Sequence, residues 1–341
     1  MHGIKERMSE TIGGEIMQLE QFTEKVVKAL EEYFGTDAEI KTQKVYKNNG
    51  ILLQGICALE KGKNIAPTVY LNDFLEQYEN GGEFGVIIKK IVRLMEENQV
   101  AESLNVNFFM DYENVKKKLV LRLINRQQNV ELLKEVPYLK FKDLAIVCHC
   151  VLVTEEIGTG SILIHNHHLE NWNIVEDTLF QDAFENSPKA EPYCIVKMSD
   201  MVKDMLRDSV EEQIDEICEE YCTNKDELLK RALENMVSEI ENAPVPMYVL
   251  TNTKRYYGAA TLVYPNMLEI IGDMLQTDFY ILPSSVHEVI FVGQEESLDS
   301  VSLNEMIEEV NRKQVAEEEW LSNHAYLYQR NKKQLISLRN Q

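Results

Sequence analysis

The fold class is decided by two alternating runs, Ala38-Glu-Ile-Lys-Thr-Gln-Lys-Val-Tyr46 and Ile51-Leu-Leu-Gln-Gly-Ile-Cys-Ala-Leu59. The segment between them, Lys47-Asn-Asn-Gly50, is typical of a tight turn because Asn and Gly tolerate a positive φ. A second turn at Lys61-Gly-Lys-Asn64 precedes a third run, Ala66-Pro-Thr-Val-Tyr-Leu71. Successive hairpins imply antiparallel pairing. We therefore expect a β-meander over residues 38–71.

Helical patterns lie on both sides of this meander. Apolar residues recur at helical spacing from Leu19 to Tyr33, and Gly35 follows as a C-terminal stop. After the meander, Asn72 is placed to cap a short helix, and Phe84 to Met95 carry the pattern of a second one. Helices combined with antiparallel hairpins predict an α+β fold.

The rest of the chain repeats this mixture. Residues 144–153 form an apolar, β-branched run that predicts a central strand covered on both faces. Residues 115–125 mix apolar and basic side chains at helix-like spacing, with a strand at 118–124 as the alternative. Further hairpins are expected over 247–264, with a strand at 259–264, and over 279–292. An amphipathic helix is expected over 303–327.

These patterns predict two α+β lobes, residues 17–160 and 244–295, separated by a mainly helical acidic region at 161–243. Residues 1–16 are expected to be an extension outside the core, with Met17 as the natural start. Residues 296–341 are expected to form the amphipathic helix and a tail.

The charge of the chain argues against a nucleic-acid partner. The formal net charge is −22, which repels phosphate backbones unless a local basic patch compensates. Two basic clusters occur, and neither is interleaved with aromatic residues, so we interpret both as solvated helix faces. They comprise Lys116, Lys117, Lys118, Arg122 and Arg126, and Arg330, Lys332, Lys333 and Arg339.

The composition also predicts the compartment. No window approaches the roughly 18 apolar residues of a membrane helix, and Met1-His-Gly-Ile-Lys-Glu-Arg lacks the apolar region of a signal peptide. The six cysteines, which are spread over a long chain, are then expected to be reduced thiols. We predict a cytoplasmic protein with no membrane partner.

Four segments carry a resemblance to a known family. They are Val45-Tyr-Lys-Asn-Asn-Gly-Ile51, Asn64-Ile-Ala-Pro-Thr-Val-Tyr-Leu-Asn72, Tyr248-Val-Leu-Thr-Asn252 with Tyr257-Gly-Ala-Ala260, and Tyr280-Ile-Leu-Pro-Ser-Ser-Val-His-Glu288. In order and spacing they resemble the bacterial family filed as domain of unknown function 5688, over about residues 17–292. The resemblance implies a cytosolic α+β fold. It implies no activity, substrate or site residue.

The segment Leu282-Pro-Ser-Ser-Val-His-Glu288 is the first candidate site. Ser284 or Ser285 with His287 and Glu288 could supply a nucleophile, a base and an acid. Along an extended chain, however, Ser285 and His287 share a face while Glu288 points away, and no Gly-x-Ser-x-Gly elbow is present. The alternative is a hairpin turn in which these side chains bond locally.

Two further groups are weaker candidates. Asn252, Lys254 and Arg255, like the turn residues Asn48 and Asn49, could contact a ligand, although both segments are good turn signals. His165-Asn-His-His168 and Cys148-His-Cys150 contain metal-ligand types, but the one-residue spacing of the cysteines does not match a zinc site. We therefore predict no metal and no cofactor.

Two functions remain open. The first is a non-enzymatic binding or regulatory protein with a protein partner, because no coherent catalytic set is present and the surface is acidic. The second is a small hydrolase or transferase using Ser284 or Ser285 with His287. The sequence assigns no oligomeric state.

Overall fold

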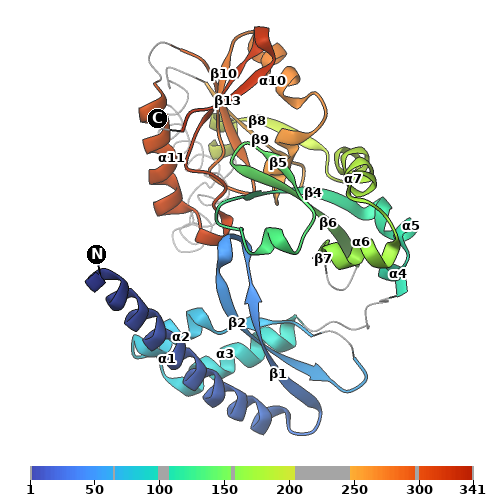
Figure 1. Cartoon of the computed structure of the whole chain (residues 1–341). Coiled ribbons are helices and arrows are strands. Elements are labelled where there is room, and N and C mark those ends of the chain that lie inside the picture. The colour runs from blue at the N-terminus through green and yellow to red at the C-terminus, as the bar shows by residue number, and fades with distance from the viewer. Residues whose placement is uncertain are drawn as a thin grey trace, which may run out of the picture. The chain divides into compact units, whose positions relative to one another are not determined.

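The computed structural model describes residues 2–63, 66–98, 107–154, 158–203, 246–295 and 299–339 (Figure 1). Its contacts divide the chain into two compact units. Unit 1 comprises residues 1–114 and 151–162, and unit 2 comprises residues 115–150 and 163–341. The predicted acidic helices at 204–245 lie outside the described residues. None of the described helices is long and apolar enough to cross a membrane.

Unit 1 contains the predicted meander, which is confirmed. Strands β1 (Ala38–Tyr46), β2 (Leu52–Glu60) and β3 (Val69–Tyr70) form an antiparallel sheet in the order β1-β2-β3. The turn between β1 and β2 is a short 3₁₀ helix, η1 (Asn48–Gly50). Asn49 adopts φ 61° and Gly50 φ 71°, the left-handed region that these residue types tolerate.

Three helices pack with this sheet around the core of unit 1. They are α1 (His2–Phe34), α2 (Asn72–Glu79) and α3 (Phe84–Glu97). The i, i+4 stripe Phe22, Val26 and Leu30 of α1 is buried together with Ile56 of β2 and Ile91 of α3. The helical spacings in the sequence therefore identified the core correctly. In addition, α1 begins at His2, so residues before Met17 continue the same helix.

Two further antiparallel sheets occur among the described residues; the second lies in unit 2, and the first lies there except for residues 151–162 of β6 and β7, which belong to unit 1. The first has the order β4-β6-β5 with β7 also paired to β6: β4 (Leu119–Asn125), β5 (Leu139–Phe141), β6 (Leu144–Thr154) and β7 (Gly158–Leu163). The second has the order β13-β12-β10-β11-β9-β8: β8 (Tyr193–Lys197), β9 (Met247–Asn252), β10 (Phe279–Leu282), β11 (Val289–Gly293), β12 (Tyr326–Gln329) and β13 (Gln334–Ser337). The α+β fold and the central position of β6 are confirmed.

Helices and short turns complete unit 2. The longer ones are α6 (Asn166–Trp172), α7 (Glu176–Ala190), α10 (Met267–Leu275) and α11 (Ser300–Gln314). Its 3₁₀ turns are η2 (Lys116–Lys118), η3 (Leu132–Lys134), η4 (Gly258–Val263), η5 (Glu317–Glu319) and η6 (Arg330–Lys332). Two further short helices lie outside unit 2 or at its boundary: α4 (Asn107–Met110) belongs to unit 1, and α5 (Tyr112–Val115) spans the boundary.

The helix expected over residues 115–125 is wrong, and the alternative strand is correct. Leu119, Leu121 and Leu123 alternate along β4 and are buried, which is the period of a strand. The outer edge of β4 is covered by α7: the Leu121 N–H donates to Ser187 Oγ at 2.9 Å, and Asn186 Nδ2 donates to the Leu119 carbonyl at 2.8 Å. Side chains of a helix thus replace the hydrogen bonds of a neighbouring strand.

The strand expected at residues 259–264 is also wrong, because this segment is the 3₁₀ helix η4. Both edges of β9 are already paired, one with β11 and the other with β8, so residues 259–264 cannot add a strand beside it. Thr261 Oγ1 donates to the Gly258 carbonyl at 2.7 Å and closes the first turn of η4.

The helix expected over residues 303–327 ends early. Helix α11 stops at Gln314, where the Trp320 indole N–H bonds to the carbonyls of Asn311 and Val315 at 3.0 and 2.9 Å and closes the helix end. The chain then forms β12 and β13 at the edge of the second sheet of unit 2. Tyr326 and Tyr328 are buried at alternate positions of β12, the period of a strand, and Tyr326 lies within the segment expected to be helical.

Candidate functional site

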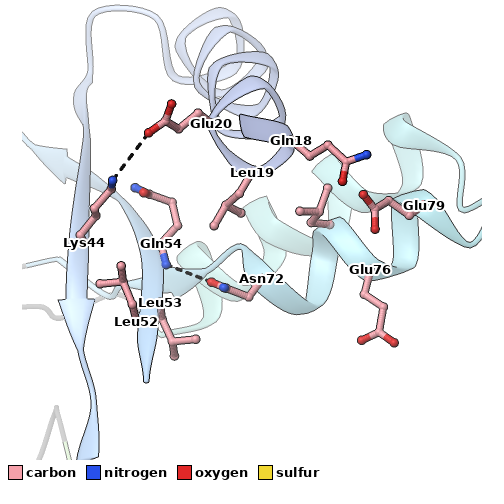
Figure 2. Close-up of a pocket in the computed structure, with 11 residues that line it drawn as sticks. Gln18, Leu19, Glu20, Lys44, Leu52, Leu53, Gln54, Asn72, Glu76 and Glu79 are labelled. Atoms are coloured by element: carbon pink, nitrogen blue, oxygen red, sulfur yellow. Dashed lines mark hydrogen bonds and ion pairs between the residues drawn. The ribbon is translucent and has the colours of Figure 1, made fainter. Parts of the chain in front are cut away.

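A groove of 470 Å³ opens in unit 1 between α1, α2 and the turn end of the β1–β2 hairpin (Figure 2). We call it the leucine groove, because its apolar lining is Leu19 of α1, Leu52 and Leu53 of β2, and Leu75 of α2. Its volume falls within the roughly 300–1,000 Å³ of ligand pockets.

The groove exists because the sheet extends beyond the helices that cover it. Alternate residues of β2 face the core, and their exposure rises toward the turn, from 0% at Ile56 to 8% at Gln54 and 38% at Leu52. Tyr46, the β1 partner of Leu52, is 73% exposed. The core face of the hairpin therefore carries apolar side chains beyond the region that other described residues cover.

Carboxylates form the rim of the groove. Figure 2 shows Gln18 and Glu79 at one end and the ion pair of Glu20 with Lys44 at the other. The Glu20–Lys44 pair is 3.6 Å apart. Glu76 and Glu79 are exposed on α2, and within the described part of the chain neither carboxylate has a hydrogen-bond or ion-pair partner. The rim is therefore negative.

A buried carboxamide lies at the base of the groove. Gln54 Nε2 makes two long contacts, to the carbonyls of Gln43 and Gly55 at 3.4 Å, while no donor among the described residues reaches its Oε1. The Gln54 backbone N–H donates to Asn72 Oδ1 at 2.9 Å. This bond ties α2 to β2, so Asn72 does not cap α2 as predicted. Acceptors thus dominate the polar lining.

Sequence reasoning missed the leucine groove because three separate elements contribute to it. One local signal was available. Leu52 and Leu53 are consecutive leucines next to the turn of a strand that otherwise alternates, and both line the groove.

The segment from Pro283 to Glu288 forms the loop between β10 and β11, as predicted. His287 Nδ1 accepts the Tyr257 N–H at 3.1 Å, so the ring proton lies on Nε2, which donates to Glu319 Oε1 at 3.0 Å. Ser285 Oγ accepts the backbone N–H of His287 at 3.1 Å. Both ring nitrogens are engaged, and neither is directed at a serine hydroxyl.

The other residues of this segment are also enclosed. Ser284 and Ser285 are buried, and the Ser285 backbone pairs with that of Trp320. Burial raises the pKa of Glu288, and the nearby His287 and Arg255 partly oppose this shift. Sequence reasoning did not find Glu319, the partner of His287, because it lies 32 residues further along the chain.

Asn252 is buried and organises its own loop. Its Oδ1 accepts the backbone N–H groups of Lys254 and Tyr256 at 3.0 and 3.3 Å, and its Nδ2 donates to the Tyr256 carbonyl at 2.8 Å. Lys254 Nζ lies 3.9 Å from Glu191 Oε1, and Arg255 adopts φ 52°. These residues build a turn. Asn48 and Asn49 occupy the turn η1 in the same way.

Arg122, which we predicted to be solvated, is buried instead. Its Nη1 and Nη2 contact Glu191 Oε2 and Oε1 at 2.5 and 2.9 Å, and the two side chains are 3% and 2% exposed. The Tyr257 ring centre lies 5.2 Å from the guanidinium carbon. This bidentate ion pair connects β4 to the end of α7.

The histidine and cysteine candidates lie in two groups, on β6 and at the start of α6. Cys148 and Cys150 are fully buried on one face of β6, and burial raises the pKa of Cys150 to about 11. Burial, together with the nearby Arg122, lowers the pKa of His149 to about 3. His168 Nδ1 accepts the His165 N–H at 2.9 Å and its ring stacks on Trp172. Within the described ranges, no group of His, Cys, Asp and Glu side chains could hold a metal ion.

The comparisons with known proteins give one match. A family model described as a family of unknown function, DUF5688, matches residues 19–330. No curated protein and no solved structure matches the chain.

Proposed function

The chain belongs to the DUF5688 family, and from this premise we propose that it is a non-enzymatic binding protein of the cytoplasm. Its site is the leucine groove, and its ligand is a basic amphipathic segment of another protein. The observation that carries the proposal is the combination of an open leucine floor with the carboxylates of Glu76 and Glu79, which have no partner among the described residues.

The ligand class follows from complementarity. An amphipathic helix binds a groove with its aliphatic side chains, which fits Leu19, Leu52, Leu53 and Leu75. Lysine or arginine side chains beside that face would meet Glu76 and Glu79, and the net charge of −22 would accelerate the approach of a cation. Gln54 Oε1 supplies an additional acceptor for a donor of the ligand.

The cytoplasmic location rests on the cysteines. Cys57, Cys148, Cys150 and Cys194 are all free thiols. Reduced cysteines are the norm in the cytosol.

The binding prediction uses a fluorescein-labelled amphipathic peptide built of leucine and lysine only, titrated with the full chain and read by fluorescence anisotropy. Leu52→Ser should weaken binding by about 10- to 150-fold, because a buried leucine contributes about 1.5–3 kcal/mol. Glu76→Gln with Glu79→Gln should weaken it about threefold at low salt and less at high salt.

Matched controls separate the groove from the general charge. Leu94 is 40% exposed on α3 and lines a different hollow of unit 1, so Leu94→Ser should bind the peptide as the wild type does. Glu31→Gln with Glu32→Gln removes the same charge from α1 outside the groove. Equal losses in the groove and control variants would contradict the proposal, as would equally tight binding of a leucine–glutamate peptide.

The second candidate function, hydrolysis or group transfer at Ser284 or Ser285, is favoured only by the contact of His287 with Glu319. We expect a fluorophosphonate probe to leave both serines unlabelled, since His287 Nδ1 and Nε2 are already engaged. The labelling is read by mass spectrometry of the loop peptide. If either serine is labelled in the wild type and not in His287→Ala, the catalytic alternative is established instead.

A further inference from the structure

A hollow of 370 Å³ in unit 2 has the opposite charge to the rest of the protein. We call it the basic hollow, since Arg126, Lys134 and Lys140 line it together with Gln127 and Tyr138. It lies where β4 ends, beside η3 and the start of β5. The chain has 57 acidic and 35 basic residues, so three cations around one hollow run against its composition.

Arg126 is the residue that points to a ligand. Its guanidinium makes no hydrogen bond or ion pair within the described part of the chain, and its Nε is buried without a partner. A buried donor without an acceptor is costly, and a charged one more so. Although the chain has 57 acidic residues, none of those that the structure describes pairs with this arginine.

Two carboxylates on neighbouring residues are occupied by other groups. Asp143, whose carbonyl accepts the Arg126 N–H, directs its carboxylate to Ser322 Oγ at 2.8 Å and Tyr326 Oη at 2.6 Å. Glu131 binds Lys134 Nζ through both oxygens, at 2.6 and 2.7 Å. Lys140 is exposed and has no counter-ion among the described side chains, so among these residues Glu131 is the one carboxylate that pairs with a cation lining the hollow.

The backbone around Arg126 is held in place before any ligand arrives. Asn125 Oδ1 accepts the N–H groups of Gln127 and Gln128 at 2.9 and 3.0 Å. Asn129 Nδ2 donates to the Asn125 carbonyl at 2.7 Å. Arg339, near the end of the chain, adds a fourth cation by donating to Gln127 Oε1 at 3.5 Å. A preorganised site loses less entropy on binding.

We propose that the basic hollow binds a small phosphate-monoester anion. The Arg126 guanidinium matches the geometry of two phosphate oxygens, and Lys134 and Lys140 add point charges. Tyr138 and Val130 offer an apolar wall for the organic part of the ester. The net charge of −22 repels a long polyanion, whereas the cations of the hollow attract a small anion that binds within it. The site is independent of the leucine groove.

The test is calorimetric titration of the full chain with phenyl phosphate, inorganic phosphate and phenol at constant ionic strength. We expect saturable binding of phenyl phosphate, weaker binding of inorganic phosphate, and none of phenol. Lys134→Gln with Lys140→Gln should weaken phenyl phosphate about tenfold, while Glu131→Gln, which frees Lys134, should strengthen it about threefold.

Two further variants complete the design. Lys117→Gln with Lys332→Gln removes the same charge from exposed positions of unit 2 and should change affinity less than about twofold. Arg126→Met should abolish binding without lowering the unfolding midpoint, because it removes a guanidinium that has no partner among the described residues. Absence of saturable binding, equal effects in the control pair, or wild-type affinity in Arg126→Met would overturn the proposal.

Discussion

Replacement of Arg122 by methionine is expected to lower the free energy of unfolding of unit 2 by about 3–5 kcal/mol. The substitution leaves Glu191, which is 2% exposed, as a buried carboxylate without its bidentate partner. Lys254 Nζ, 3.9 Å away, and Asn252 Nδ2, 3.4 Å away, are too distant to replace two direct bonds. The carboxylate must then be protonated or solvated at a cost in stability.

The measurement is urea unfolding followed by tryptophan fluorescence. Both tryptophans, Trp172 and Trp320, lie in unit 2, so their signal reports on that unit. The control is Arg122→Met combined with Glu191→Met, which removes both charges and should recover most of the loss. If the double variant is as unstable as the single one, the ion pair is not the cause and simple loss of packing explains the effect.

Replacement of Gly258 by alanine is the second large effect, with an expected loss of about 3 kcal/mol. A Cβ atom there would lie 2.1 Å from Thr251 Oγ1, 2.5 Å from the Asn252 nitrogen and 2.7 Å from the His287 carbonyl oxygen. Two of these neighbours are backbone atoms, which cannot rotate away. The loop of β10–β11 and the start of η4 must therefore separate.

Gly272 provides the matched control for this substitution. It lies in α10 of unit 2, and its nearest neighbours to an added Cβ are Arg330 side-chain atoms at 3.4 and 3.6 Å. Gly272→Ala should be neutral or stabilising by up to about 1 kcal/mol, since alanine favours a helix interior. The same fluorescence assay compares the two variants, and equal stability of both would refute the close approach at Gly258.

Local patterns predicted the elements whose partners are close in sequence. The meander, the central strand β6 and the β10–β11 hairpin follow from alternation and turn residues, which a single segment displays. The exceptions also have a physical cause. Residues 115–125 resembled a helix because basic side chains fall between the leucines. Arg122 can be buried in the strand because it pairs with Glu191, which is 69 residues away in the sequence.

The candidate sites were harder to predict for the same reason. The Pro283–Glu288 loop was located correctly, but its chemistry depends on Glu319 and the Tyr257 N–H, which hold the ring of His287. The leucine groove results from where α1 and α2 stop covering the hairpin. The sequence of β2 does not show where the helices stop covering it, and the pair Leu52 and Leu53 is the one local indication.

The most direct test of the leucine groove is amide hydrogen exchange of the full chain with and without the leucine–lysine peptide. The account predicts slower exchange at the start of β2 and along α2, residues 52–54 and 72–79, where the peptide would cover the groove. Exchange at residues 283–288 should be unchanged. Slowing confined to residues 283–288, or slowing in neither segment while the peptide is bound, would contradict the claim that this protein binds its partner through the leucine groove.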